Sequence, residues 1–346
     1  MKKIIVAPLN WGLGHATRCI PIIDNLLKQG LTPVLASDGV ALELLVKEYP
    51  DLESLVLPSY QIRYGKRLRL SLFRQVPRIL EAVKEERRLM NRYIKENSDV
   101  VGIISDNRLG VRSKQVTSVY LSHQLRVLSG ATTFLTSWVH RWYINKFDEC
   151  WVPDTPFGRF SGRLSQIKSL GIPIRHLGIL SRFTYQKRAK KFDLLVLLSG
   201  PEPKRSQLEA RLIDQLKTYD GQVGLVRGTT KPFDTTHKLP GISIYDMLVS
   251  KDLEREINQS DMILCRSGYS SVMDMAVLGK KVFFIPTKGQ YEQEYLARYL
   301  SENNQADYAT EDTFSLSDVD KMQRDLKFKV TAMKLELPAL DFFERK

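Results

Sequence analysis

The chain has 346 residues, enough for two domains of ordinary size, and its hydrophobic content of 43% supports folded cores. The formal net charge of +13 favours an anionic partner, such as nucleic acid, an anionic membrane face or a phosphorylated substrate. Three widely separated cysteines argue against a disulfide framework or a zinc site and favour a reducing compartment. No apolar run reaches the roughly 20 residues of a membrane-spanning helix. The N-terminal apolar run is too short for a secretory signal and is better explained as a first strand.

Short apolar runs alternate with amphipathic stretches along the chain. The runs predict strands at 4–7, 33–36, 100–105, 116–121 and 149–152, and then at 194–198, 223–226, 262–265 and 282–285. The stretches between them predict helices at 16–28, 71–97, 206–218 and 270–278. Buried strands that alternate with helices predict an α/β fold of parallel sheets with right-handed crossovers.

A glycine-containing loop follows the first strand, with the sequence Asn-Trp-Gly-Leu-Gly-His-Ala-Thr-Arg over residues 10–18. Thr17 occupies the third glycine position of the dinucleotide fingerprint, and Asp38 is the nearest acidic residue for a ribose, so a redox Rossmann site is disfavoured. The two glycines let the backbone turn tightly and approach a ligand. Gly14 is therefore a candidate residue for binding the donor substrate of a group-transfer reaction. His15 is expected at a helix N-terminus.

His15 is the candidate catalytic base. Beside the positive end of a helix dipole an imidazole is expected to stay neutral, which suits a general base. Asp106, at the end of the strand predicted at 100–105, is the best candidate for a carboxylate that fixes the imidazole tautomer. The alternatives are that His15 caps its helix or packs under the loop, and that Asp106 caps a helix.

Residues 60–80 contain six cations and no acid, with leucines, Phe73 and two tyrosines between them. We expect this segment to contact an anionic membrane surface, a lipid pyrophosphate acceptor or nucleic acid, with a solvated loop as the alternative. The aromatic stretch at 134–147 is either core or part of the same surface. The candidate acceptor or membrane residues are Arg63, Lys66, Arg67, Arg69 and His123.

The alternation of strands and helices restarts after a basic polar stretch at residues 182–191, which is typical of an interdomain linker. We therefore expect an N-terminal Rossmann-like domain at 1–180, a linker at 181–191 and a C-terminal Rossmann-like domain at 192–325. Residues 326–346 are expected to form a helical tail.

The most specific feature is the stretch 265–297, which predicts a strand end, a tight Arg266-Ser267-Gly268 turn, a helix, another strand and a second helix. A glycine-containing turn that opens a helix presents free backbone N–H groups and the positive end of the helix dipole, which suits a phosphate. Asp274, one turn into the helix, is placed to accept ribose hydroxyls, and Glu292 with Gln293 opens the next helix. These positions together predict a nucleotide-sugar site.

This stretch resembles the C-terminal donor-binding domain of glycosyltransferase family 28. The family pattern is Arg-Ser-Gly, an acidic residue, a helix that ends in Gly, a strand that ends in Pro, and a Gln-Gln or Glu-Gln pair. The chain matches the pattern in order with residues 266–268, Asp274, Gly279, Pro286 and 292–293. The resemblance implies the GT-B architecture, in which two doubly wound α/β domains face an interdomain cleft and a tail crosses back to the N-terminal domain.

The resemblance also implies an inverting, metal-independent transfer of a sugar from a UDP-sugar to a hydroxyl of a lipid-linked or glycan acceptor. Ser267 and Gly268 would then bind phosphate, Asp274 the ribose, and residues 292–293 the sugar hydroxyls. No cofactor is expected, because the UDP-sugar is a substrate. We expect a cytoplasmic location, peripheral on the inner membrane face, and no nucleic-acid partner.

Four further donor-binding residues follow from the resemblance. Arg182 stands at the arginine of the family's Gly-Asn-Pro-Val-Arg segment, with an exposed linker residue as the alternative. Gly200 stands in the family's Gly-Gly-Ser phosphate loop, although the Pro201-Glu202 that follows lacks one N–H and adds a negative charge. Val249 aligns with the uracil-contacting segment, and Tyr269 either stacks on the base or packs.

Other functions remain open at this point. The loop at 10–18 also resembles that of a nucleotide-sugar hydrolase with Gly-x-Gly-His before Arg-Cys, here Arg18-Cys19, so a GT-B hydrolase or epimerase is the first alternative. A non-catalytic basic protein that binds membrane or nucleic acid is the alternative of a different class. The Asp318-x-Asp320 pair matches a metal motif of the other glycosyltransferase fold, but it lies in a helical-looking tail, so no metal site is expected.

Overall fold

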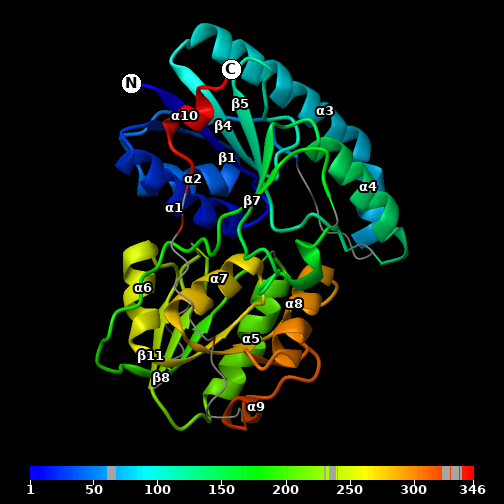
Figure 1. Ribbon diagram of the computed structural model, residues 1–346. Coiled ribbons are helices and arrows are strands. Elements are labelled where there is room, and N and C mark those ends of the chain that lie inside the picture. Colours follow the sequence, from blue (N-terminus) through cyan, green and yellow to red (C-terminus); the bar gives the residue numbers. More distant parts are fainter. Residues whose placement is uncertain are drawn as a thin grey trace. The chain divides into compact units, whose positions relative to one another are not determined.

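The computed structural model forms two compact units, Met1–Ser181 with Met333–Lys346, and Arg182–Ala332. The described residues are 1–60, 68–128, 130–167, 169–200, 202–229, 231–233, 239, 241–321, 328, 335 and 337–346, without the side chains of 68–75, 131, 320 and 340. Each unit is a parallel sheet with helices on its faces (Figure 1). The prediction of doubly wound α/β units is confirmed.

The sheet of the first unit has the strand order β3-β2-β1-β4-β5-β6-β7, and every pairing is parallel. Its strands are β1 (Lys3–Pro8), β2 (Thr32–Ser37), β3 (Ser54–Val56), β4 (Val100–Asp106), β5 (Thr117–Leu121), β6 (Glu149–Val152) and β7 (Ile174–His176). Its helices are α1 (Leu13–Lys28), α2 (Gly39–Glu48), α3 (Leu68–Glu96), α4 (Thr133–Ile144) and α10 (Leu340–Phe343), with 3₁₀ turns at Gly130–Thr132 and Gly162–Leu164.

The first strand shows why the interior strands are continuous apolar runs. Successive side chains of a strand point to opposite faces of the sheet. Ile4 packs with α1 in one buried cluster, whereas Ile5 packs with Met90 and Ile94 of α3 in another. Helices cover both faces of the sheet (Figure 1), and every residue of β1 after Lys3 is therefore buried.

The carboxyl edge of this sheet has one point where the chain changes direction. β2 and β3 lie on one side of β1, while β4 and the later strands lie on the other. The connections after β1 and β4 therefore leave in opposite directions and open a crevice between them. Such a switch point is the usual ligand site of doubly wound sheets. Here it brings the start of α1 next to Asp106, the last residue of β4.

The C-terminal segment packs on the first unit. Phe342 and Phe343 are buried, and their rings lie 5.9 Å and 6.1 Å from the ring of Trp151. Lys346 also pairs with Asp148 at 2.6 Å. In the described part of residues 326–346 the helix α10 has only four residues, because two large aromatic side chains, rather than a long amphipathic face, anchor this segment.

The second unit repeats the topology with the order β10-β9-β8-β11-β12-β13, again all parallel. Its strands are β8 (Phe192–Leu197), β9 (Val223–Val226), β10 (Ile242–Tyr245), β11 (Ser260–Cys265), β12 (Lys281–Phe284) and β13 (Asp307–Tyr308). Its helices are α5 (Lys204–Leu216), α6 (Ser250–Asn258), α7 (Tyr269–Leu278), α8 (Tyr291–Glu302) and α9 (Ser317–Asp320). The direction changes between β8 and β11, so the loops that carry Gly200 and Ser267 start from neighbouring strands.

Candidate functional site

The switch point of the first unit holds a cluster of charged and polar side chains. Asp106 is fully buried and forms a two-point ion pair with Arg18, whose Nε lies 2.6 Å from Asp106 Oδ2 while Nη2 pairs with Oδ1. Burial alone would raise the pKa of Asp106, but the charge of Arg18 outweighs it and holds that pKa well below its usual range. Asp106 is therefore ionised.

His15 lies in the first turn of α1, and its Nδ1 is 3.0 Å from Asp106 Oδ1. Burial lowers the pKa of His15, Asp106 opposes this effect, and Arg18 adds to it. The net result is a lowered pKa, so the imidazole is neutral at neutral pH. A neutral imidazole can accept a proton as a general base.

Arg18 lies at the centre of this cluster. Besides pairing with Asp106, its Nη2 is 2.8 Å from His15 Nδ1 and its Nη1 is 2.9 Å from Nδ1 of His123, which is buried two residues beyond β5. Arg18 thus connects three residues that the sequence predicts as site residues, namely His15, Asp106 and His123. Arg18 itself was not predicted as a site residue. The signal that could have found it is the three-residue spacing of His15 and Arg18, which places both on one face of a helix.

The loop before α1 owes its shape to glycine. Gly12 is the N-cap of α1 and has a φ of 86°, a conformation that other residues rarely adopt. Gly14 lies inside the helix, and its carbonyl accepts a hydrogen bond from Thr17 Oγ1 at 3.1 Å. The described contacts thus place Gly14 in the first turn of the helix, next to His15.

The switch point of the second unit contrasts with this cluster, because its central residue is a glycine in open space. Gly268 is the N-cap of α7 with an ordinary φ of −68°, and a Cβ added there would meet no atom of the described residues within 4 Å. Neither backbone conformation nor packing among these residues therefore requires glycine. No described side chain caps the helix. Its first N–H groups and the positive end of its dipole face this space, which favours an anion.

Arg266 is bound to the loops around this space. The side chain is buried, and Nη1 donates to the carbonyl of Ile285 at 3.0 Å while Nη2 pairs with Glu311 at 2.6 Å. Nη2 also lies 3.4 Å from the carbonyl of Lys204. The arginine of the Arg-Ser-Gly turn therefore ties together the loops that follow three strands.

Gln293 also holds a loop. Its Oε1 accepts from the backbone N–H of Thr287 at 2.8 Å, and its Nε2 donates to Gln290 at 2.6 Å. Its own carbonyl accepts from Ser267 Oγ at 2.8 Å. The side chain expected on sugar hydroxyls is thus bound within the unit, where it fixes the loop between β12 and α8.

Arg182 and Val249 come together at the start of α6. Nη1 of Arg182 donates to Ser250 Oγ at 2.9 Å, its guanidinium lies 4.8 Å from the centre of the Phe183 ring, and Val249 is the N-cap of α6. Two segments that the family resemblance links to the donor are therefore neighbours, although 68 residues separate Arg182 from Ser250.

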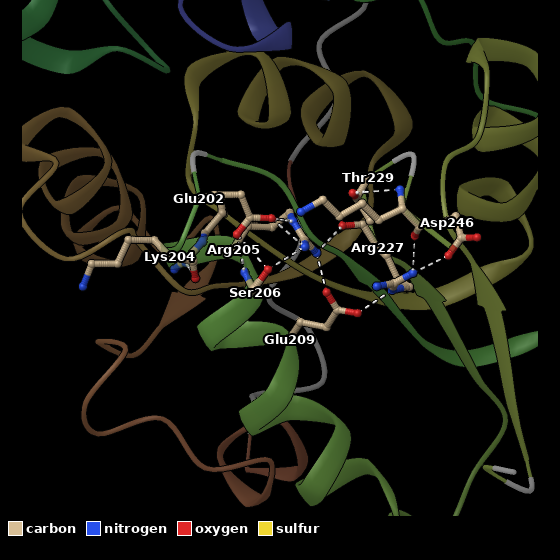
Figure 2. A network of polar contacts seen from close by, with 10 residues as sticks. Glu202, Lys204, Arg205, Ser206, Glu209, Arg227, Thr229 and Asp246 are labelled. Carbon is tan, nitrogen blue, oxygen red and sulfur yellow. Dashed lines mark hydrogen bonds and ion pairs between the residues drawn. The ribbon is translucent and has the colours of Figure 1, made fainter. Parts of the chain in front are cut away.

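The loop after β8 departs from a simple phosphate loop. Gly200 has a φ of 108°, and Glu202 accepts from Arg205 and from Ser206, each at 2.7 Å. Figure 2 shows the network continuing from Arg205 to Glu209, and from Glu209 through Arg227 to Asp246. Carboxylates thus surround the guanidinium of Arg205, which is buried and belongs to this network.

The remaining predicted residues lie as follows. Asp274 is half-buried in α7, and its charge adds to the burial that raises the pKa of Cys265. Glu292 is half-buried in the first turn of α8. Tyr269 is only 3% exposed, which favours packing over stacking on a base. Arg63, Lys66, Arg67 and the side chain of Arg69 lie outside the described residues.

The aromatic stretch 134–147 contains an exposed apolar face on α4. Five large apolar side chains there are each at least 40% exposed: Phe134, Leu135, Trp138, Val139 and Trp142. Lys146 Nζ lies 3.0 Å from the centre of the Trp142 ring. Burial and then the nearby Arg112 lower the pKa of Lys146. The ambiguity between core and surface is thereby settled in favour of surface for these five residues.

Metal ligands and membrane spans are not found in the described part of the chain. Within the described ranges no group of three or more His, Cys, Asp and Glu side chains is placed to hold a metal ion. Asp318 instead accepts from the N–H of Ser315 at 2.9 Å, beside the short helix α9. No helix in the same ranges is long and apolar enough to cross a membrane.

Comparisons with known proteins agree with these two units. Residues 208–336 match the model of the glycosyltransferase family 28 C-terminal domain. A curated relative from Haemophilus ducreyi, named UDP-N-acetylglucosamine--N-acetylmuramyl-(pentapeptide) pyrophosphoryl-undecaprenol N-acetylglucosamine transferase, is 21% identical over 87% of this chain and 82% of its own.

Solved structures show the same fold. The calicheamicin glycosyltransferase CalG4 has a TM-score of 0.68 at 11% identity, over 94% of this chain and 90% of its own. MurG of Acinetobacter baumannii has a TM-score of 0.58 at 15% identity, over 95% of this chain and 93% of its own. Both likenesses extend over the two units, which fits the GT-B architecture expected from the sequence.

Proposed function

Because the chain is a family 28-like glycosyltransferase of the GT-B fold, we propose that it transfers a sugar from a UDP-sugar to an acceptor hydroxyl, with inversion and without a metal. The observation that carries the proposal is the open space in front of α7. There Gly268, the N-cap of α7, leaves room at the switch point of the second unit, in front of a helix end that no described side chain caps.

The second unit supplies the donor contacts. The N–H groups that begin α7 bind the diphosphate beside Gly268, Asp274 accepts from the ribose, and Glu292 contacts the sugar. Gln293 holds the loop through Thr287. Val249 contacts the uracil, Arg182 neutralises the phosphates, and Gly200 lets the loop after β8 approach them. The dipole of α7 and the charge of Arg182 then stabilise the charge that develops on the leaving UDP, without a metal ion.

The first unit supplies the base. His15 takes the proton of the acceptor hydroxyl, the oxygen attacks the anomeric carbon from the side opposite the diphosphate, and the bond from that carbon to the diphosphate breaks. UDP leaves with the bonding electrons, and the proton passes from His15 to solvent. Asp106 orients the imidazole through the 3.0 Å contact at Nδ1.

The direct test is a donor and acceptor screen. Purified protein is incubated with radiolabelled UDP-sugars and a bacterial lipid extract, and labelled lipid is separated by thin-layer chromatography. We expect label in the lipid fraction with one UDP-sugar and none with a His15→Ala variant. Labelled product equal to background with every donor, from a protein that also fails to bind UDP, would contradict the proposal.

The acceptor is proposed to be lipid-linked, with the protein peripheral on the cytoplasmic face of an anionic membrane. The curated relative's name includes a pyrophosphoryl-undecaprenol acceptor. The α4 face, with Trp138 and Trp142 exposed next to Lys146, has the aromatic and basic composition of helices that lie in the membrane interface.

Vesicle sedimentation tests this membrane proposal. Wild-type protein should sediment with vesicles of phosphatidylglycerol and phosphatidylethanolamine, and less with neutral phosphatidylcholine. Replacing Trp138 and Trp142 together by Ser should release it. The matched control is Tyr185→Ser, which removes an aromatic ring that is 61% exposed in the second unit. Equal release by both variants would contradict the assignment of α4.

Hydrolysis of the nucleotide-sugar is the second candidate function. The neutral imidazole at position 15, held by Asp106, can activate water as well as a hydroxyl. Release of free sugar at a steady rate without any acceptor, unchanged by added lipid extract, would favour hydrolysis over transfer.

A further inference from the structure

We propose that Arg18 is a positioning residue that keeps His15 unprotonated, because its guanidinium takes the place that an imidazolium would otherwise hold as the counter-ion of Asp106. The proposal deepens the proposed function, and it rests on that function only for its kinetic consequence. The geometry of the cluster in the ligand-free protein carries it.

The buried carboxylate needs a cation. Asp106 is fully buried at the end of β4, and an ionised carboxylate in such a place is stable only when it is paired. In a simple His–Asp pair the partner available would be His15, which would gain a proton and a positive charge. Here Arg18 already binds both oxygens of Asp106, through Nε and Nη2.

The contacts of His15 Nδ1 oppose a charged ring. This nitrogen is 3.0 Å from Asp106 Oδ1 and 2.8 Å from Arg18 Nη2. A neutral imidazole satisfies one of these neighbours in either tautomer, since Nδ1 either donates to the carboxylate or accepts from the guanidinium. An imidazolium must carry hydrogen on Nδ1, so its N–H would face an N–H of a permanently charged guanidinium.

The other side of the Arg18 guanidinium also needs a hydrogen-bond acceptor. Nη1 of Arg18 is 2.9 Å from Nδ1 of His123, and a guanidinium only donates, so this nitrogen must be the acceptor. The guanidinium of Arg18 is thus held by Asp106 and by Nδ1 of two imidazole rings, and these three groups come from α1, β4 and the segment after β5.

This arrangement has a consequence for a general base. A histidine that is the sole partner of a buried carboxylate has a raised pKa, so it is still protonated at a pH where an ordinary histidine is neutral. A protonated imidazole cannot accept the proton of a hydroxyl. With Arg18 present, Asp106 still orients the ring, but the ring stays neutral. Arg18 therefore separates orientation of the base from its protonation.

The test is a pH titration of the histidines in the ligand-free protein by ¹H–¹⁵N NMR. The chain has five histidines, and a His15→Gln variant assigns the signal. Arg18→Gln removes the charge but keeps an amide that can donate to Asp106, and Arg18→Lys is the matched control because it keeps the charge. We expect His15 to be neutral at pH 7 in the wild type and in Arg18→Lys, and protonated at pH 7 in Arg18→Gln.

Two results would overturn the proposal. One is a His15 that is protonated at pH 7 in the wild type, which decides the matter even if the variants do not fold. The other is an Arg18→Gln variant in which His15 titrates as in the wild type. Neither result depends on turnover, so failure of the transferase proposal leaves this test intact.

A kinetic readout adds the link to function. In Arg18→Gln the acid limb of kcat/KM should move to higher pH, so that activity at pH 7 falls by about 10-fold, consistent with loss of a correctly protonated base. Donor affinity should not change, because the proposed donor contacts belong to the second unit. Activity at high pH should recover, which a variant that is merely misfolded would not do.

Discussion

The two switch points occupy the same place in the same kind of sheet, yet they are filled differently. At the first, between β1 and β4, the ionised Asp106 contacts Arg18 and His15, and Arg18 in turn contacts His123. At the second, between β8 and β11, the central residue is Gly268, which lies in open space. The charged groups around it are paired with one another, as Arg266 is with Glu311. The difference supports our proposal that the first switch point supplies the base and the second binds the diphosphate.

The largest expected effect is on turnover. His15→Ala should lower kcat by about 10²- to 10⁴-fold, the usual contribution of a general base, and should leave the dissociation constant of UDP unchanged. Steady-state kinetics and calorimetry on the same preparation measure the two quantities. Near-normal turnover with the native acceptor would remove His15 from the chemistry and erase the contrast between the two switch points.

Glu209 at the centre of the network in Figure 2 should have the largest effect on stability. It accepts from both Arg205 and Arg227, so Glu209→Ala leaves two largely buried guanidinium groups without their shared partner (Figure 2). Breaking a buried ion pair from one side costs about 3 to 5 kcal/mol. Urea unfolding measures the loss, with Glu302→Ala, an exposed carboxylate on α8, as the control. A loss equal to that of the control would mean that the network does not hold the loop after β8.

Gly268→Ala tests the open space in front of α7. The φ of −68° suits alanine and the added methyl group meets no atom of the described residues within 4 Å, so stability should fall by no more than about 1 kcal/mol, the usual cost of alanine at an N-cap. If the space belongs to a bound diphosphate, the methyl group should weaken UDP binding at least about 10-fold, or about 1.4 kcal/mol. UDP affinity equal to that of the wild type would show that the glycine does not serve a ligand.

Acid should weaken the first unit through His140. Nε2 of its ring is buried and has no hydrogen-bond partner among the described residues, and burial lowers the pKa of His140 to about 4. Between pH 6.5 and 4 the unfolded chain binds a proton that the folded chain does not, so the free energy of unfolding falls as pH falls through this window. The ring is partly enclosed, and a loss of about 2 kcal/mol is expected. Urea unfolding of His140→Phe should lose this pH dependence, while an unaltered profile would contradict it.

The interior of both sheets could be predicted from the sequence, and their edges could not. All nine predicted strands are present, while β3, β7, β10 and β13 were not predicted. These four are the outermost strands of the two sheets, have two to four residues each, and are only partly buried. A strand that is covered on one side only carries no continuous apolar run, so periodicity gives no signal for it.

The positions of the site could be predicted better than the contacts within it. His15, Asp106 and Gly268 lie at the switch points because each is at or just after the end of a predicted strand. The central place of Arg18 in the first cluster was not predicted, and neither were the hydrogen bonds of the Gln293 side chain with Thr287 and Gln290. Such choices depend on which buried polar group needs a partner, and that is decided by the packed structure rather than by local sequence.

The most direct test of the central claim is a calorimetric titration of the wild-type protein with UDP. The account predicts saturable one-site binding below millimolar concentration that persists in His15→Ala and weakens in Gly268→Ala. Absence of binding at millimolar UDP, from protein that is folded by circular dichroism, would contradict the assignment of the second unit as the donor site.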